Sequence, residues 1–156
     1  MILSNLPRNL AVMCAVLWVG GMWAVGYLVA PALFQALSDR QVAGMLAGKM
    51  FTWMAYVGIS CALYLLAYQL YQNGSAVIKQ TLFIVTLSML ILLLIGQFGI
   101  QPFMADLKAQ ALPLDVMHSE LASQFKALHG VSSILYLIQS LLGIVLVVKL
   151  IPAKAA

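Results

Sequence analysis

Four long apolar runs dominate the pattern of hydrophobic and polar positions along the chain. They cover residues 10–34, 50–70, 82–100 and 131–150. The only charged residue inside them is Lys149, which lies at the end of the last run. A helix of about 20 apolar residues spans roughly 30 Å of hydrocarbon. The pattern therefore predicts an all-α integral membrane four-helix bundle, with spans at about residues 10–36, 47–72, 79–103 and 127–150.

The connections between these runs carry further signals. Pro31 lies about one turn before the first span ends, which predicts a kinked or unwound helix there. Gly74 lies in a short polar segment and predicts a tight turn between the second and third spans. In the third connection, Pro113 and Asp115 are residues typical of helix starts. From there we expect an amphipathic helix near the interface, leading into the fourth span.

Composition supports the same fold class and narrows the function. The chain is 64% hydrophobic and 8% charged, which is too apolar for a soluble domain of 156 residues. The first run is longer than the 7 to 15 residues of a signal peptide's apolar region, so we expect a retained helix. The sequence contains no nucleophile with a base, phosphate loop or zinc motif, and nothing in it supports binding to nucleic acid. A non-enzymatic protein is the favoured interpretation.

Orientation depends on a balanced set of charges. With four spans both termini lie on one side, and each side carries four Lys or Arg residues. The terminal amino group adds to one side and all four acidic residues lie on the other, which favours cytoplasmic termini.

The fourth span has a polar stripe on one side. In a helical projection at 100° per residue, five positions fall within about 60° of His129. They are Ser132, Ser133, Tyr136, Ser140 and Gly143. Hydroxyl groups in lipid need partners and small residues let helices approach closely, so we expect this stripe to face protein.

Antiparallel threading places further polar residues in the same leaflet as His129, opposite the termini. The resulting candidate polar site comprises His129, Ser132, Ser133, Tyr136, Gln97, Gln101, Tyr56 and Tyr27. Polar clusters inside a membrane suggest function. The alternative is that they form interhelical hydrogen bonds, each worth about 0.6 kcal/mol, that only specify packing. His129 is accordingly either a ligand or proton carrier, or a structural interface residue.

Sulfur-containing residues raise a separate metal hypothesis. Nine methionines and two cysteines would suit Cu(I), which prefers soft ligands. The candidate ligands are Met50, Met54 and Cys61, which share a helical stripe, together with His129. However, methionine commonly fills apolar packing and a buried cysteine is usually inert. We therefore predict no cofactor and keep haem or copper as alternatives.

Four short motifs, in order along the chain, resemble the transmembrane protein 205-like family. They are Trp18-Val-Gly20-Gly21, the Ala-Pro-Ala-Leu-Phe of residues 30–34, Lys49-Met50-Phe51 and the segment 125–132 around His129. Thr52 departs from the pattern, since related sequences often have Pro there. The family consists of small four-helix membrane proteins whose bacterial members are mostly described as a domain of unknown function.

The family is distantly similar to copper-resistance protein D and to the membrane-bound protoporphyrinogen oxidase. Those relatives are expected to carry a histidine in the first span, whereas residues 10–14 of this chain contain none. The resemblance thus implies a fold and a multi-pass location in the bacterial inner membrane, and it does not imply haem binding.

The sequence as a whole predicts a membrane protein that binds or passes a small solute or metal ion, or that supports a partner membrane protein. Its expected partners are the lipid bilayer and either a second copy of the chain or another membrane protein. The alternative is a haem- or copper-dependent redox or metal-resistance protein with His129 as a ligand.

Overall fold

The structure is a computed structural model that describes residues 5–112 and 114–150. Four helical segments are long and apolar enough to cross a membrane. They are Leu6–Ala36, Arg40–Lys79, Thr81–Ala111 and Ala122–Leu150. The prediction of an all-α, multi-pass membrane bundle is confirmed, and each helix extends beyond the apolar run that predicted it.

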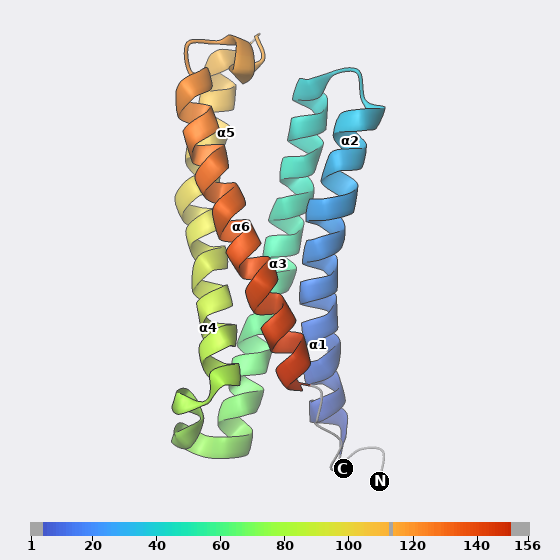
Figure 1. Cartoon of the computed structure of the whole chain (residues 1–156), viewed down its shortest axis with the longest axis vertical. Helices are drawn as coiled ribbons and strands as arrows, with labels where there is room; N and C mark the ends of the chain where they lie inside the picture. The colour runs from blue at the N-terminus through green and yellow to red at the C-terminus, as the bar shows by residue number, and fades with distance from the viewer. Residues whose placement is uncertain (1–4, 113, 151–156) are drawn as a thin grey trace.

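The chain runs up and down the bundle four times (Figure 1). The first segment consists of α1 (Leu6–Trp23), η2 (Ala24–Val29) and α2 (Ala30–Ala36), and the second of α3 (Arg40–Asn73) and η3 (Gly74–Lys79). The third consists of α4 (Thr81–Leu94), η4 (Ile95–Ile100) and α5 (Gln101–Ala111), and it is followed by η5 (Val116–His118) and α6 (Ala122–Leu150). Because α1 begins and α6 ends at the same end of the bundle, the two ends can be compared directly.

Two prolines change the helical geometry in the same way. Pro31 lies in the first turn of α2 and Pro102 in the first turn of α5, and each follows a six-residue π-helix, η2 or η4. Proline lacks an N–H group and its ring clashes with the carbonyl four residues earlier, so the wider π turn accommodates it. The disturbance predicted at Pro31 is therefore a π-helix. The two π-helices and the two prolines are both offset by 71 residues, so the rising segments of the two halves share one plan.

The second connection is the tight turn that the sequence predicts. Gly74 has φ of +58°, in the left-handed region that favours glycine, and the turn continues as the 3-10 helix η3. The third connection differs from its prediction. Asp115 does not start a long helix, because its carboxylate accepts a 2.7 Å hydrogen bond from the Met117 amide and caps only η5. Pro113 lies outside the described residues.

The amphipathic segment is therefore not a separate interfacial helix. Residues around Phe125 form the first turns of α6, which is continuous into the fourth span. Ser119 Oγ accepts from the Leu121 amide, so side chains satisfy the backbone of the loop and the helix begins only at Ala122.

The end of the bundle where α1 begins is closely packed. Trp18, Leu65, Met89 and Leu146, from four different helices, are at most 1% exposed. Small residues permit this approach: the Trp18 ring lies against Gly58, where a Cβ would be 2.5 Å from the indole Nε1. The core of the protein therefore lies at this end.

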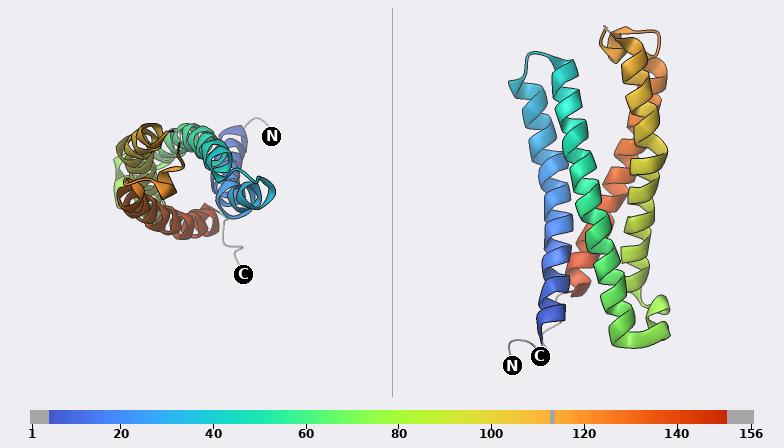
Figure 2. Two further views of the ribbon diagram at one scale, coloured as in Figure 1. Left: turned by 90° about the horizontal axis from the view of Figure 1, so that it is seen from above. Right: turned by 180° about the vertical axis from the view of Figure 1, so that it is seen from behind.

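At the opposite end the helices separate into two pairs, α2 with α3 and α5 with the start of α6 (Figures 1 and 2). The segments η2, α2 and η4 contain no buried residue. We call this region the diverging end and the opposite one the closed end.

Candidate functional site

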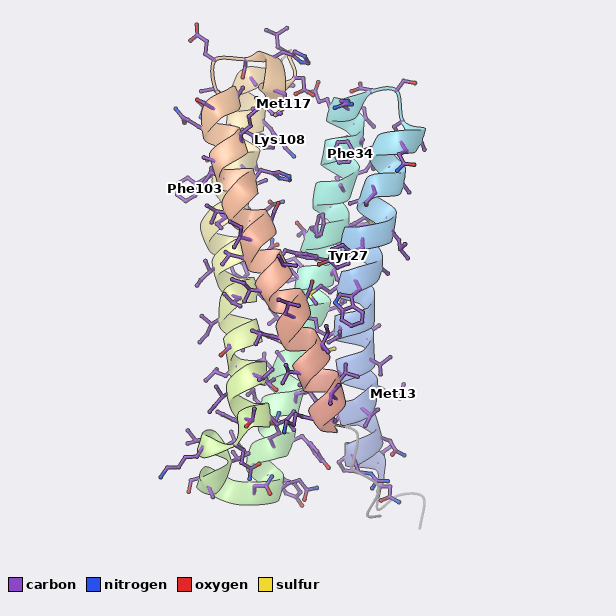
Figure 3. The ribbon with its side chains drawn as sticks, viewed as in Figure 1. Met13, Tyr27, Phe34, Phe103, Lys108 and Met117 are labelled. Carbon is purple, nitrogen blue, oxygen red and sulfur yellow. The ribbon has the colours of Figure 1, made fainter. Side chains whose placement is uncertain are left out.

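An aromatic layer marks the level at which the two pairs begin to diverge. The Tyr27 hydroxyl donates to Ser140 Oγ at 2.9 Å, and the Tyr136 hydroxyl donates to the Met22 carbonyl. The Tyr136 ring meets those of Phe51 and Tyr27 edge-on, with centroids 5.4 and 6.0 Å apart. This layer joins η2, α1, α3 and α6, and Figure 3 shows Tyr27 near the height at which α6 crosses the first helix.

The polar stripe of α6 faces protein over only part of its length. Tyr136 is half-buried and Ser140 is buried, as predicted, but His129 and Ser133 are exposed. Ser133 Oγ donates to the His129 carbonyl of its own helix at 2.8 Å. The prediction that the whole stripe faces protein is therefore wrong at its first turns, because the helix pairs have separated there. Ser132 is half-buried between the two regions.

The remaining polar candidates are dispersed around this layer. Gln97 is half-buried in η4. Gln101 is half-buried in α5, and its amide nitrogen would lie 3.6 Å from a Cβ at Gly48 of α3. Tyr56 is 53% exposed. The structure thus joins Tyr27 to the fourth helix, while His129 and Tyr56 remain exposed.

A lysine that the sequence analysis did not select lies above the aromatic layer. Lys108 of α5 is half-buried, and its ammonium donates a 3.4 Å hydrogen bond to the Gly44 carbonyl of α3. The same ammonium lies 5.5 Å from the centroid of the Phe125 ring, which stacks on His129 with an interplanar angle of 11°. Lys108 therefore bridges the two helix pairs where they diverge.

The electrostatic environment of Lys108 is unusual for a lysine. The carbonyl and the aromatic ring that it contacts carry no net charge. Asp115 attracts the ammonium from the neighbouring loop, but its carboxylate is already bound to the Met117 amide. Spacing could have revealed Lys108, since Gln101, Met104 and Lys108 lie on one helical face. The analysis missed it because it ended the third helix at about residue 103.

The candidate metal ligands lie at different levels of the bundle. Cys61 is 4% exposed in the closed-end core, and Met54 Sδ would lie 2.6 Å from a Cβ at Gly21. Met50 is half-buried and His129 is exposed at the diverging end. Within residues 5–112 and 114–150, no group of three His, Cys, Asp or Glu side chains is placed to hold a metal ion. The structure does not bring the four candidates together.

Comparison with known families identifies one relationship. The family model described as "Domain of unknown function (DUF4149)" matches residues 13–113, from α1 through α5. No curated protein and no solved structure matches the chain. The expectation of an uncharacterised membrane family is confirmed, and the likeness to the transmembrane protein 205-like family and to copper-resistance protein D stays a prediction.

Proposed function

The chain belongs to the DUF4149 family, and we propose that it binds a small organic anion at the diverging end of its bundle. The observation that carries this proposal is Lys108, a half-buried cation whose direct contacts are a carbonyl and an aromatic ring. A charge placed near hydrocarbon is costly unless it is paired. An anion between the helix pairs would supply the missing opposite charge.

The surroundings of Lys108 also favour an anion with an apolar part. Phe34 packs on the other side of Gly44, with its Cζ atom 3.7 Å from the position of a Cβ there. Phe125 lies beneath the ammonium, and Phe51 belongs to the aromatic layer below. An aromatic or short-chain carboxylate would place its charge on Lys108 and its apolar portion against these rings.

Binding is a better fit than passage through the bundle. The aromatic layer closes the space below Lys108, and Tyr27 and Tyr136 are each hydrogen-bonded across helices. Below that layer the closed end is filled by Trp18 and its neighbours. A solute could cross only if these contacts separated.

We retain the bacterial inner membrane and cytoplasmic termini as part of this proposal. In that orientation the diverging end opens towards the outer side of the membrane. The site would then take its ligand from outside the cell interior.

The test is benzoate binding to the purified protein, measured by isothermal titration calorimetry with benzylamine as the oppositely charged comparison. We expect benzoate to bind and Lys108→Gln to weaken it about tenfold, as expected for losing a hydrogen bond to a charged group. Lys49→Gln and Lys126→Gln are matched controls, because both lysines are exposed on the neighbouring helices. Unchanged benzoate affinity in Lys108→Gln, or equal binding of benzylamine, would contradict the proposal.

A further inference from the structure

A second concave feature lies on the other side of α5. It is a groove of about 410 Å³ between α5 and α6. Its lining residues are Phe103, Asp106, Leu107, Gln110, Gln124 and Leu128. Asp106 precedes Lys108 by two positions, which on a helix turns it about 200° away. The groove is therefore distinct from the proposed anion site.

The lining changes from apolar to polar along the helix axis. Phe103 and Leu128 lie inside the spans predicted from hydropathy, which end at about residue 103 and resume at about 127. Asp106, Gln110 and Gln124 lie beyond these limits, towards the loop. Phe103 is 63% exposed and points away from the bundle (Figure 3). The groove thus has an apolar portion at hydrocarbon depth and a polar portion at headgroup depth.

The charge of the groove indicates which headgroup fits it. Asp106 supplies one negative charge, and no lining residue is positive. The side-chain amides of Gln110 and Gln124 can each donate and accept hydrogen bonds. A headgroup with a primary ammonium complements the carboxylate, while its phosphate oxygens can accept from the amides. An anionic headgroup would be repelled, and a quaternary ammonium has no N–H group to donate.

We propose that this groove holds a membrane phospholipid with a primary-amine headgroup. The ammonium lies at Asp106, the phosphate lies at the glutamine amides, and an acyl chain follows Phe103 and Leu128 into the bilayer. The volume lies within the 300 to 1,000 Å³ range of small-molecule sites. A membrane lipid is favoured over a soluble amine because the apolar half of the groove lies at the depth of the acyl chains.

The test is native mass spectrometry of the full chain, purified with an equimolar mixture of phosphatidylethanolamine, phosphatidylcholine and phosphatidylglycerol that share the same acyl chains. We expect phosphatidylethanolamine to be retained roughly fivefold over the other two, as one partly exposed charge contact would give. Asp106→Asn should reduce this preference to less than about twofold. Leu128→Gln should reduce retention of all three lipids together.

The control is Glu120→Gln, which removes an exposed acid from the same end of the protein. It should leave the preference unchanged, so that a general effect of surface charge can be recognised. Equal retention of the three lipids by the wild-type protein would overturn the proposal, as would a preference that persists in Asp106→Asn. Because benzoate binding depends on Lys108, the outcome of this experiment is independent of the function proposed above.

Discussion

The two ends of the bundle use the same kind of chain in different ways. At the closed end, alanines and glycines such as Ala15 and Gly58 let the helices approach, and large side chains such as Trp18 fill the remaining space. At the diverging end, α2 and both π-helices have no buried residue, and contacts between the helix pairs are made by tyrosines and a lysine. Stability should therefore depend on the closed end, and ligand binding on the diverging end.

The largest expected effect tests the closed end. Trp18→Ala should reduce the free energy of unfolding by about 3 to 5 kcal/mol, because a large side chain that is 1% exposed leaves a cavity. Trp53→Ala is the matched control, since that indole is 61% exposed and should contribute little to packing within the chain. Unfolding in detergent by a denaturing surfactant measures both. Equal losses for the two variants would show that the closed end is not the stabilising core.

A smaller change tests the close approach itself. A Cβ at Gly58 would lie 2.5 Å from Trp18 Nε1 and 2.7 Å from Leu93 Cδ1, so Gly58→Ala should cost about 1 to 3 kcal/mol through overpacking. At Gly130 of the diverging end, a Cβ would meet nothing within 4 Å. There, Gly130→Ala should be neutral or stabilising by up to about 1 kcal/mol, through helix propensity. Thermal unfolding of the two variants measures the contrast, and a similar loss in both would contradict it.

Sequence could predict the spans because apolar length alone specifies them. It could not predict where they end, because α5 continues past Asp106 and Lys108, and hydropathy does not detect helix in the headgroup region. The same limit applies to the site. Helical projection correctly turned Tyr136 and Ser140 towards protein, but a projection gives a direction and not the presence of a neighbour. For this reason it also turned His129 inward, where no helix covers it.

The aromatic layer should contribute modestly to stability, since it joins the two ends. Tyr27→Phe and Ser140→Ala each remove one partner of a 2.9 Å hydrogen bond. A double-mutant cycle on the unfolding free energy should give a coupling of about 0.6 kcal/mol, the typical value for such bonds in membranes. A coupling of zero would mean that packing alone holds η2 against α6.

The smallest expected effect concerns His129, the residue that the sequence made most prominent. It is exposed and lies next to Lys108 only through the Phe125 ring, so His129→Ala should change stability by less than about 0.5 kcal/mol. Benzoate affinity should change less than about twofold, because the Lys108 charge and its carbonyl contact remain. Calorimetry beside Lys108→Gln measures this, together with the haem absorption and copper content of both proteins. A loss of benzoate binding equal to that of Lys108→Gln would place the imidazole in the site, whereas stoichiometric haem or copper that His129→Ala releases would favour the redox alternative.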